Sequence, residues 1–248
     1  MAEIFKFSIN NIDDHVRKIG IDVRPVIEFK LDREKLYDMG KNLTDKYPHL
    51  FESLVQSPTD FHIEKKFIFP GKGEANCSTL VIAQRGPVFI FPIRLSVLGE
   101  ETDLQSSDIQ DVVIEGLKIF RKTFPTKHLL RVGLINEYIF DTGMADSTKI
   151  VAGRFTKVSV PPNGEIMLRV NRPDDDFNRR IEIEAVKKVE RMPEMPGQQN
   201  IKSYGVKVIV DFNNRNMSQD LEKNAIRTIL SEAEQYNKEE LFTFLNGE

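Results

Sequence analysis

Alternation of apolar and polar residues dominates the second half of the chain and predicts strands there. In residues 179–186, "RRIEIEAV", the apolar residues Ile181, Ile183 and Ala185 alternate with Arg and Glu. One face of such a strand is apolar and the other is charged, which is typical of a sheet covered on one side only. Similar patterns predict further strands over residues 129–140, 165–170 and 205–212.

The first half predicts an entry segment over residues 1–22, followed by strands. The first strand is expected in "RPVIEFKLD", where Pro25 restricts it to a strand start or an edge. Arg85-Gly86 predicts a tight turn between two of the later strands. These later strands are expected over residues 61–69, 78–84 and 87–97.

Apolar residues at helical spacing predict two long helices. The first opens at Ser107, where Gln110 completes a capping box, and extends to residue 124. The second begins near Ser218 and extends to Glu240. A shorter helix is expected over residues 32–47, and residues 146–156 are ambiguous.

The order of these elements repeats between residues 1–126 and residues 127–248. Each half contains a strand, a helix, three strands and a long helix, although the two halves share no sequence identity. We therefore expect an α+β fold with a mainly antiparallel, curved sheet and the long helices on one face. The two halves would be β-α-β-β-β-α units within one compact body, an order similar to half of the TATA-box-binding protein saddle. That likeness concerns fold alone.

Composition indicates a soluble globular protein without a strong electrostatic preference. The 248 residues carry 35 basic and 38 acidic side chains, a formal net charge of -3, so net charge does not indicate nucleic acid or an anionic membrane as partner. The N-terminus lacks the apolar core of a signal peptide, and no apolar run is long enough to span a bilayer. The single cysteine excludes an internal disulfide. We expect a cytoplasmic location.

Residues 131–136, "RVGLIN", carry a family resemblance. They resemble the Arg-Val-Gly-Leu-Arg-Tyr-Ile-Asn signature of a sporadically distributed, uncharacterised family of bacterial proteins of about 250 residues. The likeness extends to "RPVIEFKL" and to "VIVDF" followed by a helix ending in "FTFL". This chain lacks the family's second Arg. The resemblance implies a single compact bacterial protein and no catalytic residue.

The triple aspartate in residues 169–180 predicts a turn. Asp174, Asp176 and Asn178 match the opening of a calcium loop. The sixth position, which needs Gly, is Arg179, and the twelfth, which needs a bidentate Glu, is Ala185. Asp and Asn side chains bond to nearby backbone amides in turns, so we expect a turn and no bound metal; Asp174 and Asp176 remain the weak metal candidates.

An enzymatic alternative rests on four charged residues in two strands. "HIEKKF" and "IEIEAVKK" resemble the Glu-x-Glu-x-Lys strand of triphosphate tunnel enzymes, which hold a metal and polyphosphate inside a barrel. The residues concerned would be Glu64, Lys66, Glu182 and Glu184, although His62 replaces the family's first Glu. Ordinary cross-strand ion pairs explain the same residues. The hypothesis requires that these side chains converge on one cavity.

Binding is the function that the sequence favours, because it contains no complete catalytic motif. Phe89 and Phe91 share strand parity and should share a face, either in the core or on an interaction surface. Asn136 lies in an otherwise apolar strand, where it should be partly buried with hydrogen-bond partners, or should contact a ligand. We expect a non-enzymatic protein without cofactor that binds a protein partner, or itself as a homo-oligomer, through a sheet surface or edge.

Overall fold

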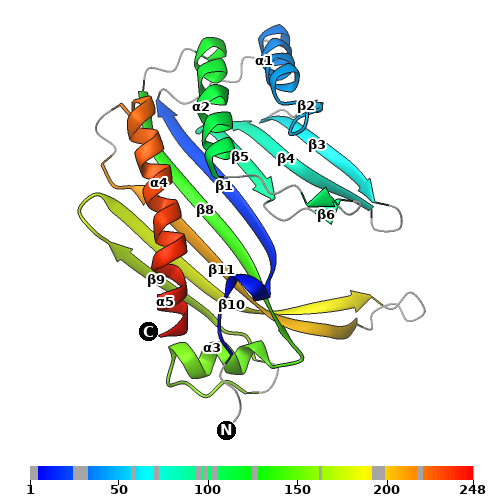
Figure 1. The fold of residues 1–248 in the computed structure, drawn as a ribbon, viewed down its shortest axis with the longest axis vertical. Helices are drawn as coiled ribbons and strands as arrows, with labels where there is room; N and C mark the ends of the chain where they lie inside the picture. The colour runs from blue at the N-terminus through cyan, green and yellow to red at the C-terminus, as the bar shows by residue number, and fades with distance from the viewer. Residues whose placement is uncertain are drawn as a thin grey trace.

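The computed structural model shows one antiparallel sheet that both halves of the chain build together (Figure 1). The structure describes residues 5–24, 33–56, 60–69, 73–92, 96–97, 100–101, 106–124, 128–161, 164–191, 199–216 and 220–247. Across the sheet the strands follow the order β2 (Ser53–Gln56), β3 (Phe61–Phe69), β4 (Gly73–Ala83), β5 (Gly86–Pro92), β1 (Ile12–Arg24), β8 (His128–Gly143), β11 (Gln199–Asn214), β10 (Phe177–Arg191) and β9 (Met167–Pro173). A separate small pair consists of β6 (Ser96–Val97) and β7 (Glu100–Glu101).

The helices lie on one face of this sheet (Figure 1). They are α1 (Arg33–Lys46), α2 (Ser106–Thr123), α3 (Ser147–Phe155), α4 (Lys223–Glu239) and α5 (Leu241–Asn246), with a 3-10 turn at Ile9–Asn11 before β1. Helix α2 packs on β5 and α4 packs on β8 and β11. The predicted α+β fold with an antiparallel, curved sheet and helices is confirmed.

Strand alternation determines which side chains form the core. The inward positions of the central strands are almost completely buried, for example Ile19 in β1, Leu134 in β8 and Val210 in β11. The long helices contribute matching apolar stripes from their inner faces, including Val113 and Ile229. The core therefore lies between the sheet and the helices.

The centre of the sheet differs from the sequence prediction. Residues 12–24 form the central strand β1, which pairs with β5 on one side and β8 on the other, whereas the sequence predicted an entry segment up to residue 22. The strand expected at residues 24–32 lies almost entirely outside the described residues. The ambiguous segment 146–156 forms α3. The helices expected at 32–47 and from Ser107 are α1 and α2, with ends that differ by one residue.

Candidate functional site

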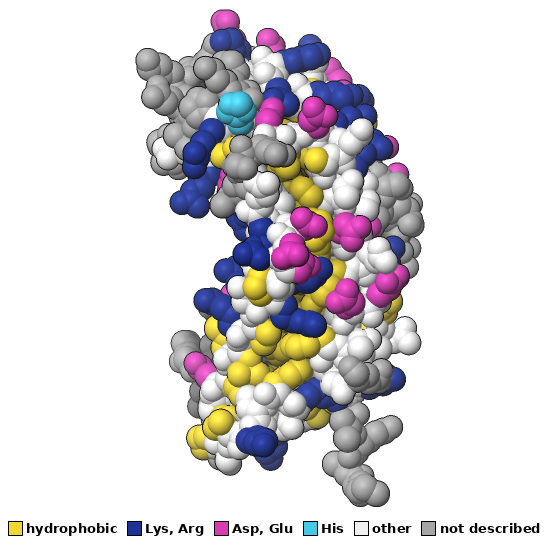
Figure 2. Space-filling model, turned by 90° about the vertical axis from the view of Figure 1, so that its left-hand side faces the viewer, with side chains coloured by type: hydrophobic (Ala, Val, Ile, Leu, Met, Phe, Trp, Pro, Cys, Tyr) yellow, Lys and Arg dark blue, Asp and Glu magenta, His cyan; other side chains and the backbone are white. Residues whose placement is uncertain are grey.

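The opposite face of the sheet carries none of the described helices, and we call it the open face. In the part of the chain that the structure describes, it is formed by the alternate strand positions that point away from the helices. In the five strands from β1 to β9 they include Val16, Lys18, Gly20, Asp22, Arg131, Gly133, Ile135, Glu137, Ile139, Lys207, Ile209, Asp211, Asn213, Arg180, Glu182, Glu184 and Arg169. Figure 2 shows the molecule as a crescent, with Lys and Arg side chains along its hollow side.

Ion pairs connect neighbouring strands across the open face. Asp22 of β1 lies 3.7 Å from Arg131 of β8, and Arg131 lies 3.7 Å from Asp211 of β11. Arg180 of β10 lies 3.4 Å from the same Asp211 carboxylate, whose side chain is only 8% exposed. The charges therefore alternate in sign from strand to strand, and we call Asp22, Arg131, Asp211 and Arg180 the charge ladder.

A second group of charges lies along the same three central strands. Glu137 of β8 accepts a hydrogen bond of 2.5 Å from Lys18 of β1, and its other oxygen lies 3.9 Å from Lys207 of β11. Ile135 and Ile209 are half-buried between this group and the charge ladder. Two half-buried aliphatic side chains thus lie between two groups of paired charges on the open face.

A notch lies beside Gly20 at the centre of the open face. Gly20 of β1 pairs directly with Gly133 of β8. A Cβ atom at Gly20 would meet no atom within 4 Å. One at Gly133 would meet the side chains of Asn213, Asp211 and Arg131 at 3.6–3.9 Å, because these side chains cover Gly133. Glycine in a strand weakens the strand and often marks a place where another backbone or a ligand approaches closely. The sequence shows both glycines, but only the pairing register brings them together.

A cavity of about 320 Å³ opens on the same face in the first half of the sheet. Three of its seven lining residues are aliphatic, Val16, Val81 and Ile90, and the others are His62, Glu64, Ser78 and Thr79. Nε2 of His62 lies 2.9 Å from Oδ1 of Asp60 just outside the cavity. The cavity thus places aliphatic side chains next to the buried carboxylate of Glu64.

The four residues of the tunnel hypothesis do not come together. Glu64 lies in β3, whereas Glu182 and Glu184 lie in β10, and five strands separate β3 from β10. β3 and β10 are thus six inter-strand steps apart, and at about 4.8 Å per step the distance along the sheet is roughly 29 Å. The side chain of Lys66 lies outside the described residues. Because the sheet ends in the free edges β2 and β9, it encloses no tunnel in the described structure, and Glu182 instead pairs with Arg169 at 2.8 Å.

The two phenylalanines considered for an interaction surface lie in the core. Phe89 and Phe91 have 0% exposure, and their rings are parallel within 9° at 6.4 Å. They do share a face, as their parity predicts, but it is the face under the helices. Phe89 lies directly under Gly116 of α2. Neither ring is accessible to a macromolecular partner.

Asn136 is completely buried between the sheet and α4, in a polar network with His15, Arg17 and Glu234. Its Oδ1 accepts a hydrogen bond of 3.1 Å from Nε of Arg17, and Nε2 of His15 lies 2.9 Å from the same oxygen. Arg17 continues to Glu234 of α4 at 3.1 Å. The His15 ring stacks on Tyr138 with 4.3 Å between centroids. This network connects β1, β8 and α4, and Asn136 is buried with hydrogen-bond partners as the sequence predicted.

The triple aspartate forms the turn between β9 and β10. Oδ1 of Asp174 accepts hydrogen bonds from the backbone N–H groups of Asp176 and Phe177, at 3.0 and 2.6 Å. Its other oxygen pairs with Arg179 at 2.6 Å. These bonds, first the one from Phe177 N–H, hold the pKa of Asp174 below its usual range. Among the described residues no three His, Cys, Asp or Glu side chains are grouped as metal ligands.

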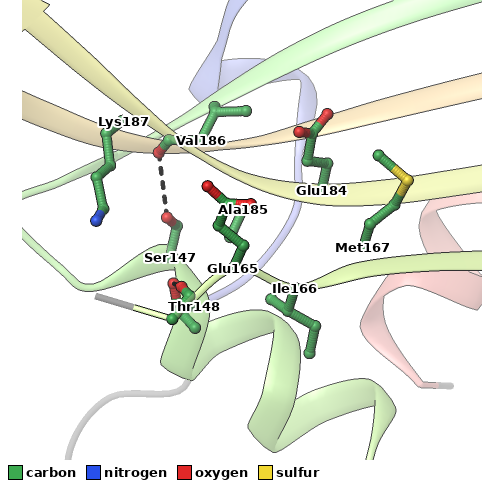
Figure 3. Close-up of a pocket in the computed structure, with 10 residues that line it drawn as sticks. Ser147, Thr148, Glu165, Ile166, Met167, Glu184, Ala185, Val186 and Lys187 are labelled. Carbon is green, nitrogen blue, oxygen red and sulfur yellow. Dashed lines mark hydrogen bonds between the residues drawn. The ribbon is translucent and has the colours of Figure 1, made fainter. Parts of the chain in front are cut away.

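A further cavity of about 440 Å³ lies between the start of α3 and β10 (Figure 3). Ser147 Oγ donates to the carbonyl of Val186 at 3.2 Å, the dashed line in Figure 3. Thr148 Oγ1 donates to the carbonyl of Gly164 at 3.2 Å, and Thr148 N donates to Oδ1 of Asp146, which caps the helix. These hydroxyl groups hold the segment before β9 against β10 and already have partners within the chain.

These features define an α+β protein with an antiparallel sheet that is covered by helices on one face and open on the other. None of the described helices is long and apolar enough to cross a membrane. The chain matches no family model and no curated protein. Membership of the bacterial family that residues 131–136 resemble remains a prediction.

Proposed function

We propose that this protein is a non-enzymatic, cytoplasmic binding protein that holds a protein partner on the open face of its sheet. The observation that carries the proposal is the notch at Gly20, in the centre of a face that has half-buried aliphatic residues and paired charges. A partner that covers this face would bury Ile135 and Ile209, and its polar groups would meet charges that are already held in place by their neighbours.

The charge pattern favours a protein over a nucleic acid. Each basic group of the charge ladder has a carboxylate within 4 Å, as Arg131 has with both Asp22 and Asp211. A phosphate backbone approaching Arg131 or Arg180 would meet these carboxylates as well, which opposes the counterion release that drives nucleic-acid binding. A protein surface can present both signs of charge at this spacing.

The tunnel-type enzyme has no support in the geometry. Its residues occupy opposite halves of an open sheet, so no described cavity combines Glu64 with Glu182. We therefore propose binding alone.

A single substitution tests the open face. Gly20→Val fills the notch without meeting another atom at Cβ, and valine favours a strand, so the fold should keep its melting temperature. Gly153→Val is the matched control, because Gly153 is exposed on α3 and also has no atom within 4 Å of a Cβ. Each tagged variant would be expressed in the cells of origin and captured under nuclease treatment, and the co-purified proteins would be quantified.

The expected result is that Gly20→Val reduces one specific co-purified protein by about tenfold, which corresponds to about 1.4 kcal/mol of binding energy. Gly153→Val should retain that protein in full. Sedimentation velocity of the purified chain shows whether the partner is a second copy. Equal recovery with Gly20→Val and the wild type would exclude the open face as the binding surface.

A further inference from the structure

The two halves of the sheet differ by one strand at their outer edges. When the central strands β1 and β8 are counted as the first of each half, the fourth strand is β3 in the first half and β9 in the second half. β3 pairs with β2 in antiparallel orientation, whereas β9 ends the sheet in the described structure. A strand is therefore present beside β3 at a place that stays open beside β9.

β9 is more exposed than the other strands of the second half. Five of its seven residues are exposed, and Met167 at its start is 58% exposed. Figure 2 looks onto the side of the molecule where β9 lies and shows hydrophobic side chains at the surface. An edge of this kind is a template on which another strand can pair.

The hydrogen bonds to β10 show which backbone groups of β9 point outward. Asp174 N donates to Phe177 O at one end, and Ala185 N donates to Ile166 O at the other. In an antiparallel pair the bonding positions alternate, so even-numbered residues of β9 bond to β10. The N–H and C=O groups of Met167, Arg169 and Asn171 therefore point away from the sheet.

The side chains of β9 indicate what a partner strand must carry. On the helix face, Leu168 is half-buried against the core, next to the half-buried Val170. On the open face, the Arg169 side chain is 61% exposed and pairs with Glu182 of β10 on its inner side. An adjacent strand would thus gain from apolar residues on one face and from an acidic residue beside Arg169 on the other.

We propose that β9 is the docking edge for an extended partner segment in which apolar and acidic residues alternate, and that this segment pairs antiparallel to β9 as β2 does to β3. A second copy of the chain is a poorer occupant. β9 has the sequence "MLRVNRP", which contains no acidic residue, so no pairing of β9 with another β9 places a carboxylate opposite Arg169. The proposal does not depend on the open face.

The test uses two synthetic peptides and two variants of the full-length protein. The probe is an acetylated and amidated octapeptide of alternating Val and Glu, and the control peptide alternates Val and Lys. Asn171→Pro removes one outward N–H that β10 does not use, which an edge strand tolerates. Asn171→Ala changes the same side chain and keeps the N–H. Binding is followed through the backbone amide NMR signals of the labelled protein.

The Val/Glu peptide should shift the amide signals of Met167, Arg169 and Asn171 in a saturable way. The Val/Lys peptide should bind less tightly, and Asn171→Pro should weaken the Val/Glu peptide by about fivefold, the ratio expected for the loss of one backbone hydrogen bond. Asn171→Ala should bind like the wild type. Gly20→Val should also bind normally, which separates this proposal from that of the open face.

Three results with the peptides would overturn the proposal. They are shifts that avoid β9, equal affinity for the two peptides, and equal affinity of Asn171→Pro and Asn171→Ala. Dimerisation of the free protein through β9, detected as concentration-dependent shifts of the same amides without peptide, would assign the edge to a second copy instead and would also refute the proposed occupant.

Discussion

Replacement of Asn136 by alanine tests whether the buried polar network holds α4 to the central strands. The substitution removes the oxygen that accepts from Arg17 Nε and lies 2.9 Å from Nε2 of His15. Both donors are buried, at 9% exposure each, so the space left behind gives them little access to water. The structure predicts destabilisation, because a buried donor that loses its acceptor retains its desolvation cost.

The magnitude follows from the number of groups affected. One buried donor left unpaired costs roughly 1–3 kcal/mol, and two are affected here. The Nδ2 group of Asn136 is itself buried without a partner among the described residues, so its removal relieves part of that cost. Arg17 also keeps its bond to Glu234. We therefore expect a loss of about 1–3 kcal/mol in the free energy of unfolding.

Urea unfolding of Asn136→Ala measures this loss, with Asn171→Ala as the matched control. Asn171 is the same residue type in a strand, but it is exposed on β9 and should change stability by less than about 0.5 kcal/mol. A loss below about 0.5 kcal/mol for Asn136→Ala, combined with loss of partner binding, would show that Asn136 acts in binding and that the network does not hold α4 in place.

Three further substitutions test other parts of the structure. Burial raises the pKa of Tyr138 to about 12 from 10.0, so the free energy of unfolding should fall by roughly 2–3 kcal/mol as the pH rises from about 10 to 12. Urea unfolding at several pH values should show a smaller fall for Tyr138→Phe. Asp174→Ala should lower the free energy of unfolding by about 1 kcal/mol, and millimolar calcium should leave the wild-type melting temperature unchanged. A calcium-dependent rise in the melting temperature that Asp174→Ala abolishes would show a metal site. Gly116→Ala places Cβ 2.7 Å from the Phe89 ring and should cost about 1–3 kcal/mol. The same change at the open position Gly153 should stabilise by about 0.5–1 kcal/mol, and similar effects at the two glycines would contradict the packing under α2.

Elements with a clean hydrophobic period could be predicted from the sequence. Ile181 and Ile183 alternate with charged residues in β10 because the helices cover only one face of that strand. The apolar stripe of residues 107–124 gave α2 to within one residue at each end, since it covers the strands with one face. In these elements local pattern and tertiary packing agree, so the pattern alone is sufficient.

The central strand β1 could not be predicted, because its local pattern and its packing in the fold do not agree. Inward positions of β1 include His15 and Arg17, and their partners Asn136 and Glu234 lie more than a hundred positions away in the sequence. The sequence alone does not show these partners, and residues 12–18 by themselves resemble a polar segment outside the sheet. The buried network that stabilises the strand thus also hides it from any argument based on hydrophobic alternation.

The candidate site depends on pairings between distant segments. Phe89 and Phe91 illustrate the limit, because parity shows that they share a face but not which face the helices cover. The notch depends on the register that places Gly20 opposite Gly133. A shift by one residue would move every side chain to the other face, so the open face is defined only once the register is known.

Strand β1 shows how the two faces of the sheet are kept distinct although both carry charge. Its inward Arg17 is 9% exposed and forms an ion pair with Glu234 of α4. Helix α4 must therefore cover this face for the buried charge to be compensated. Its outward Lys18 and Asp22 pair instead with Glu137 and Arg131 of the neighbouring strand, and these side chains remain 24–39% exposed. Burying a charge requires its particular partner, whereas charges paired within the sheet need no covering helix. The open face can therefore stay in contact with water, while α4 is confined to the other side.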